Sequence, residues 1–105
     1  GDVSQDTDAR RIVAETIKAF GRLDVLVNNA GVVLPGRVDN TTEEDWERSM
    51  AVNLRGPFLV AKHAIPELRK AGGGVIVNIA SAVFWFLYLA ATCLKVGPSN
   101  FLSTW

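Results

Sequence analysis

Two apolar segments of similar sequence, VLVNNAG (25–31) and VIVNIAS (75–81), constrain the fold of this chain more than any other feature. Each segment runs through apolar residues to an Asn and an Ala, and ends in a very small residue. Short runs of Val, Ile and Leu without alternation are typical of strands that are buried on both faces. The sequence therefore predicts strands over 24–28 and 74–79, with small residues at carboxyl ends that a ligand can approach.

The stretch between these segments has the pattern of a long helix. It opens with threonines that can cap a helix and with acids that the helix dipole favours, over 41–45. An apolar stripe then recurs every third or fourth residue from Trp46 to Leu68. A second amphipathic pattern predicts a helix over 8–20. Strand, helix and strand in this order predict a right-handed parallel unit, and hence an open α/β sheet.

Composition narrows the classes of function. A chain of 105 residues forms one domain at most, and its eleven basic and eleven acidic side chains cancel. No electrostatic field therefore favours nucleic acid or anionic lipid. The single Cys93 suits a reducing compartment, which predicts a cytoplasmic location. Charge is uneven, because Lys95 is the one charged residue among residues 72–105.

Three motifs together with the first residues of the chain resemble the classical short-chain dehydrogenase/reductase family. They are DVLVNNAG (24–31), MAVNLRGPF (50–58) and VIVNIAS (75–81), and the opening GDVS resembles the end of the family's third strand. The resemblance covers 1–81, which we interpret as the middle part of a Rossmann-type domain. Residues 82–105 form an apolar C-terminal segment that diverges from the family. The resemblance implies a doubly wound parallel sheet that is incomplete, without the first βαβ unit and the C-terminal strands.

The same resemblance implies a nicotinamide cofactor, NAD or NADP, that exchanges hydride with a small carbonyl or alcohol substrate. Matched position by position, two residues would contact the adenine, three would line the adenosine side of the cleft, and two would be catalytic. In that order they are Asp2 and Val3; Asn28, Ala30 and Gly31; and Asn53 and Ser81.

The two catalytic candidates also have physical reasons for their roles. Pro57 lacks an N–H, so the carbonyl of Asn53 loses its helical partner, and we expect a kink whose free carbonyl can hold a water. The alternative is a plain proline kink beside an incidental Asn. A hydroxyl at Ser81 could donate a hydrogen bond to a substrate carbonyl as negative charge develops there. The alternative is a serine that merely ends a strand.

Several residues have simpler interpretations. Asn28 and Gly31 could be a polar strand end and a turn glycine, and we expect Asn28 to bond a neighbouring backbone. The glycine run 72–74 follows a helix, so it predicts a helix cap and turn rather than a phosphate loop. His63, the only histidine, is interpreted as a surface residue, and no metal cluster is expected.

Two parts of the family pattern have no counterpart in the sequence. One is the glycine-rich turn that holds the cofactor pyrophosphate. The other is Tyr-x-x-x-Lys, because the only tyrosine is Tyr88 and the next lysine is Lys95. On a helix such a pair would be about 10.5 Å apart along the axis, too far for the lysine to tune the phenol. We therefore predict a truncated and inactive chain.

Two alternatives remain open. The chain could be a non-catalytic partner that dimerises through the helix at 41–71. It could instead be a membrane segment, since 75–94 is long enough to span a bilayer and contains no charged residue. The strand predicted up to Ser81 counts against a membrane segment, because the residues left after it are too few to span.

Overall fold

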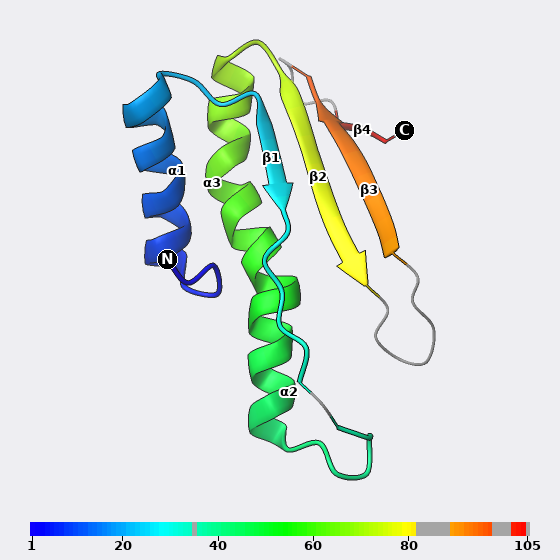
Figure 1. Cartoon of the computed structure of the whole chain (residues 1–105). Coiled ribbons are helices and arrows are strands. Elements are labelled where there is room, and N and C mark those ends of the chain that lie inside the picture. The colour runs from blue at the N-terminus through cyan, green and yellow to red at the C-terminus, as the bar shows by residue number, and fades with distance from the viewer. Residues whose placement is uncertain (35, 82–88, 98–101, 105) are drawn as a thin grey trace.

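The computed structural model describes residues 1–34, 36–81, 89–97 and 102–104 (Figure 1). Helices dominate the first two thirds of the chain and strands the last third. The elements in order are α1 (Asp6–Phe20), β1 (Val25–Asn28), α2 (Glu43–Met50), a π-helix η1 (Ala51–Arg55), α3 (Gly56–Lys70), β2 (Gly74–Ser81), β3 (Leu89–Val96) and β4 (Leu102–Thr104).

The strands form one sheet in the order β1-β2-β3-β4. β1 and β2 are parallel, in a register that runs from Val25 opposite Val75 to Asn28 opposite Asn78. The helical crossover between them confirms the α/β class and the predicted strand–helix–strand unit. β3 and β4 pair in antiparallel fashion, which the sequence analysis did not predict.

The segment after Ser81 corrects one assumption. The spacing of Tyr88 and Lys95 was considered on a helix, but Lys95 lies in strand β3 and Tyr88 lies outside the described residues. β3 pairs with β2 along its whole length, from Gly74 opposite Val96 to Ser81 opposite Leu89. Unpaired main-chain groups along the edge of β2 favour this arrangement, because an extended segment satisfies them.

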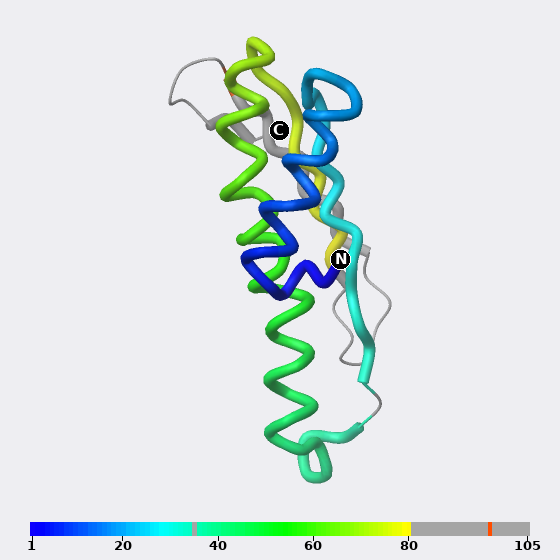
Figure 2. The backbone as a smooth tube through the Cα atoms, turned by 90° about the vertical axis from the view of Figure 1, so that its left-hand side faces the viewer, coloured from blue at the N-terminus to red at the C-terminus, as the bar shows by residue number. Residues whose placement is uncertain are grey.

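Helix α1 packs on α3. Its buried residues Ala9 and Val13 contact Leu59, Val60 and Ala64 in one apolar cluster. The helix ends at Phe20, as predicted, because Gly21 adopts a left-handed conformation with a φ of 77°. Figure 2 shows α1 alongside the long helix that α2, η1 and α3 form together. The α2 part of this helix extends past the carboxyl ends of β1 and β2 (Figures 1 and 2).

The long helix has the expected cap and an unexpected turn. Its N-cap is Thr42, whose Oγ1 accepts a hydrogen bond from the N–H of Asp45 at 3.1 Å. The disturbance expected near Pro57 is a π-helical turn over 51–55, in which the N–H of Gly56 donates to the carbonyl of Ala51. A wide turn suits this position, because Pro57 has no N–H to offer the carbonyl of Asn53.

The glycine run after α3 is the predicted helix cap and turn. The N–H of Gly73 donates to the carbonyl of Leu68 at 2.9 Å, and both Gly72 and Gly73 have positive φ. Gly74 is needed for a different reason, since a Cβ there would lie 2.5 Å from the carbonyl oxygen of Asp24. The amino ends of β1 and β2 are thus packed backbone to backbone.

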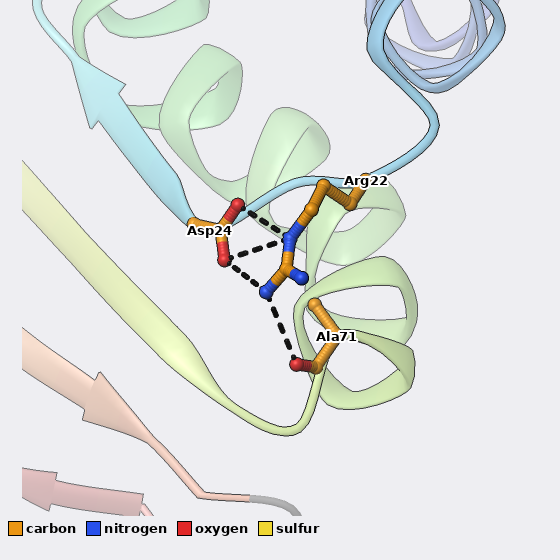
Figure 3. A network of polar contacts seen from close by, with 3 residues as sticks. All are labelled: Arg22, Asp24 and Ala71. Atoms are coloured by element: carbon orange, nitrogen blue, oxygen red, sulfur yellow. Dashed lines mark hydrogen bonds and ion pairs between the residues drawn. The ribbon is translucent and has the colours of Figure 1, made fainter.

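An ion pair at the exposed surface strengthens this amino edge (Figure 3). Arg22 Nη2 lies 2.6 Å from Asp24 Oδ1, and Arg22 Nε lies 2.9 Å from Asp24 Oδ2. The same guanidinium donates to the carbonyl of Ala71 at 3.4 Å, just past the end of α3. The hydrogen bond from Arg22 lowers the pKa of Asp24.

Among the described residues, helices cover only one face of the sheet (Figure 1). On that face Leu68 and Ile76 are fully buried, with Leu26 packed against them. The opposite face leaves apolar side chains in solvent, with Val25 52 %, Val27 54 % and Ile79 37 % exposed. We call these three residues of β1 and β2 the bare face.

Candidate functional site at the carboxyl edge of the sheet

The carboxyl ends of β1 and β2 are joined by two asparagines. Asn28 and Asn78 are opposite each other in the register, and Asn28 Nδ2 donates to Asn78 Oδ1 at 2.8 Å. Asn28 is only 8 % exposed, so this bond satisfies a buried amide. We expected Asn28 to bond a neighbouring backbone, but this bond goes to a side chain. The sequence analysis assigned no role to Asn78, although both motifs place an Asn at the same position.

Asn53 connects the π-helical turn to the segment that follows β1. Its Oδ1 accepts from the N–H of Val32 and its Nδ2 donates to the carbonyl of Val32, both at 2.8 Å. Nδ2 also lies 3.3 Å from Ser49 Oγ. The amide therefore bonds both main-chain groups of Val32, as a neighbouring strand would. This pair of side-chain hydrogen bonds was not predicted, since the sequence analysis assigned a role only to the main-chain carbonyl of Asn53.

Gly31 lies against the same amide. A Cβ at Gly31 would be 3.4 Å from Asn53 Oδ1, and both Gly31 and its neighbour Ala30 are exposed. The structure thus brings Asn53 and Gly31 together, as the two parts of one loop-to-helix junction. Small exposed residues at this edge leave the backbone open to a ligand.

Asp2 and Val3 lie at the start of α1, close to α3. Asp2 Oδ1 accepts from the N–H of Ser4 at 2.9 Å and from its Oγ at 2.7 Å. The hydrogen bond from the Ser4 side chain is the main reason that the pKa of Asp2 is lowered. Val3 packs on Gly56, where a Cβ would lie 2.8 Å from Val3 Cγ2. Because Gly56 directly follows the π-helical turn, Val3 lies near the helix segment that carries Asn53.

Ser81 is the last residue of β2 and so lies at the same carboxyl edge. Its position in the strand places it there, opposite Leu89 of β3. Lys95 pairs with Val75 at the other end of β2. Six residues of strand separate the two register positions, which corresponds to about 20 Å. The one lysine of the C-terminal segment is therefore remote from Ser81.

His63 and its partner Asp6 lie away from the carboxyl edge of the sheet. His63 Nε2 is 2.9 Å from Asp6 Oδ1, which links α3 to α1 and lowers the pKa of Asp6. Within the described ranges, no group of His, Cys, Asp and Glu side chains could hold a metal ion. Nor does any helix in the described part of the chain have the length and apolar character needed to cross a membrane.

An α/β unit whose parallel strands end in small residues and amides defines a class of proteins that bind ligands at the carboxyl edge of the sheet. The family model for short chain dehydrogenases matches residues 1–88 of this chain. The chain therefore belongs to the short-chain dehydrogenase/reductase family, and the match extends slightly past the boundary expected at Ser81.

Curated relatives agree with this family. An uncharacterized oxidoreductase of Thermotoga maritima is 54 % identical over 81 residues, which are 77 % of this chain and 32 % of the relative. An NAD-dependent glycerol dehydrogenase of Listeria innocua is 39 % identical over 80 residues, which are 76 % of this chain and 32 % of the relative. The chain thus spans about a third of the length of these relatives.

Solved structures place the fold in the same family. The crystal structure of a 3-ketoacyl-ACP reductase from Sinorhizobium meliloti matches with a TM-score of 0.73 and 38 % identity. The match covers 77 % of this chain and 32 % of that protein. The incomplete Rossmann-like fold predicted from the sequence is confirmed.

Proposed function

We propose that this chain is the middle segment of a nicotinamide-dependent oxidoreductase, and that it is inactive by itself. The single observation that carries the proposal is the junction at the carboxyl edge, where Asn53 holds Val32 beside Gly31. In the whole enzymes of this class, the bound NAD or NADP supplies or accepts a hydride, and a small carbonyl or alcohol is the second reactant. The lone Cys93 supports a cytoplasmic location as part of the same proposal.

The described residues fit the adenosine side of such a cofactor. Ala30 and Gly31 are small and exposed beside the end of β1, so a flat ring could approach the backbone there. The exposed Asp2 carboxylate can accept a hydrogen bond from an adenine amino group. Val3 offers an apolar surface next to it, and the buried Asn28 holds the strand end in place. The described residues contain no glycine-rich turn ahead of a helix for the pyrophosphate.

Inactivity follows from the missing acid/base pair. In our proposal Ser81 donates a hydrogen bond to the substrate oxygen, and the Asn53 carbonyl holds a water. Neither group replaces a positioned proton donor of suitable pKa. Lys95 cannot assist, because its register position is about 20 Å from that of Ser81 along the strand.

A turnover assay tests this proposal. We expect the purified chain to oxidise neither NADH nor NADPH when it is given small aldehydes and ketones. The Ser81→Ala variant serves as the matched control and should give the same background rate. Turnover by the wild-type chain that is lost in Ser81→Ala would contradict the proposed inactivity.

A second candidate function is pairing of two copies through the long helix, which a separate observation favours. Trp46, Leu54 and Phe58 are 54 %, 62 % and 65 % exposed, in steps of four and eight residues. Leu54 and Phe58, together with Met50, border a shallow hollow along η1. Two such helices in antiparallel arrangement about Val52 would place Trp46 opposite Phe58 of the second copy.

Charge complementarity supports this antiparallel arrangement. The same symmetry brings Glu47 near Arg55 of the second copy, and both residues line the hollow. Sedimentation of Phe58→Glu against Phe20→Glu tests the pairing, since Phe20 is also exposed, at 78 %, but lies at the end of α1. We expect only Phe58→Glu to produce monomers, and a wild-type chain that is monomeric at high concentration would contradict the pairing.

A further inference from the structure

The side-chain amide of Asn53 satisfies Val32 in one orientation only. The N–H of Val32 needs the amide oxygen Oδ1 as its acceptor, and the carbonyl of Val32 needs a hydrogen from Nδ2; both bonds are 2.8 Å long. An amide turned over by half a turn would place donor against donor and acceptor against acceptor, and both bonds would be lost. The group that fixes this orientation therefore decides whether the loop after β1 is held against η1.

Ser49 contacts the part of the amide that Val32 leaves open. Nδ2 carries two hydrogens, and the carbonyl of Val32 accepts one of them. Ser49 Oγ, at 3.3 Å from Nδ2, is an acceptor for the other. On the oxygen side, a Cβ at Gly31 would lie 3.4 Å from Oδ1, so the loop backbone is close to the amide there. The Asn53 amide is therefore held by the loop on one side and by Ser49 on the other.

The position of Ser49 in the long helix suits this contact. Ser49 lies in the last turn of α2 and Asn53 in η1, four positions later, which is the spacing of neighbours on one helix face. A serine inside a helix usually points to solvent or bonds the carbonyl four residues before it. Here its oxygen accepts from the side chain four residues after it. Helix propensity does not account for this serine, because alanine is the better helix former.

We propose that Ser49, to which the sequence analysis assigned no role, is a positioning residue that acts on the candidate site through Asn53. By accepting the second Nδ2 hydrogen, it holds the amide in the orientation that binds both main-chain groups of Val32. With both hydrogens engaged, the Asn53 side chain has none to donate to a substrate, so Asn53 acts there through its main-chain carbonyl. This role at a substrate site rests on the proposed function, whereas the hold on Val32 is measurable without cofactor or substrate.

Amide hydrogen exchange in the full chain, followed by nuclear magnetic resonance, tests the proposal with Ser49→Ala as the first variant. Alanine strengthens the helix, so a serine with only a helical role predicts unchanged or slower exchange throughout. The positioning role predicts the opposite at one place, with exchange at the Val32 amide about threefold faster or more and the amides of β2 unchanged. The resonances of the Asn53 Nδ2 hydrogens should shift in the same variant.

Two variants of matched shape separate the hydroxyl from the helix. Ser49→Thr and Ser49→Val have equally branched side chains of similar helix propensity, but only threonine keeps an oxygen that can accept from Asn53. We expect exchange at the Val32 amide to be close to that of the wild type in Ser49→Thr and accelerated in Ser49→Val. Thr16→Val is the control, because it removes the bond from Thr16 Oγ1 to the carbonyl of Ile12 in α1 and should leave Val32 unchanged.

Two results would overturn the positioning role. One is that Ser49→Ala leaves the Val32 amide as protected as it is in the wild type. The other is equal Val32 exchange in Ser49→Thr and Ser49→Val, because the effect would then follow the shape of the side chain rather than its hydroxyl. Failure of the proposed function is distinguishable from both, since it would appear as turnover of NADH or NADPH by the wild-type chain and leave these exchange rates as they are.

Discussion

The amino and carboxyl edges of the β1–β2 pair are held together in different ways. At the amino edge the backbone of Gly74 approaches that of Asp24, and Arg22 bridges to the end of α3 (Figure 3). At the carboxyl edge the contacts are side-chain amides, from Asn28 to Asn78 and from Asn53 to Val32. Close backbone packing leaves no room for a ligand, whereas side-chain amide hydrogen bonds fix the strand ends and leave small residues exposed. The difference indicates which edge has a structural role and which can bind.

The largest effect is expected at the amino edge, for Gly74→Val. Its Cβ would meet the Asp24 carbonyl at 2.5 Å and Leu68 Cδ2 at 2.6 Å, and neither the backbone nor the buried leucine can move freely. We expect a loss of about 3 kcal/mol or more in the free energy of unfolding, measured by urea titration. Gly72→Ala is the control, since only its φ of 93° is unfavourable, and it should cost about 1 kcal/mol. Equal losses would show that close packing does not distinguish this edge.

The next largest effect is expected for the buried amide pair at the carboxyl edge. Asn28→Leu removes the hydrogen bond to Asn78 Oδ1 from a position that is only 8 % exposed, and we expect a cost of about 2 kcal/mol. The double variant Asn28→Leu/Asn78→Leu should recover part of that loss, because the two leucines, opposite each other in the register, can then contact each other. Urea titrations of the wild type, Asn28→Leu, Asn78→Leu and the double variant complete the double-mutant cycle. Strictly additive losses would contradict a coupled pair.

Elements defined by local pattern could be predicted from the sequence. Both strands of the parallel pair, the cap at Thr42 and the glycine turn after α3 depend on neighbouring residues. The contacts that build the candidate site could not be predicted. Asn28 and Asn78 are fifty positions apart, and Asn53 is twenty-one from Val32, so their bonds depend on how the elements pack. The matching Asn in VLVN and VIVN was the one signal available for the first contact.

The strand at 89–96 also could not be predicted from its local sequence pattern. LAATCLKV has neither a clear alternation nor a helical stripe, and alanine and leucine favour helices. Its conformation depends on the edge of β2, which is formed by residues earlier in the chain. A tertiary partner therefore overrides the local preference.

A smaller effect is expected for the exposed hydrogen bonds between Asn53 and Val32. Asn53→Ala removes both bonds to Val32, which water can replace in part, so the cost should be about 1 kcal/mol. Exchange at the Val32 amide should accelerate, whereas the amides of β2 should be unaffected. Asn53→Asp is the sharper comparison, because it keeps the acceptor for the N–H of Val32 but loses the donor to its carbonyl. Restored protection in Asn53→Asp would show that the acceptor alone holds the loop.

The smallest effect is expected for the exposed ion pair at the amino edge. The hydrogen bond from Arg22 lowers the pKa of Asp24 from its ordinary value of 3.8. A carboxyl whose pKa is lower in the folded chain stabilises the fold above that ordinary value and loses this contribution as the pH falls through the folded pKa. Arg22→Gln should therefore lower stability slightly at neutral pH, and by progressively less as the pH falls below that ordinary value, as urea titrations across pH 2–7 would show. Added salt should reduce the difference, because both partners are more than half exposed. A difference between Arg22→Gln and the wild type that persisted at pH 2 would mean that the bond to the Ala71 carbonyl, rather than the charge pair, holds this edge.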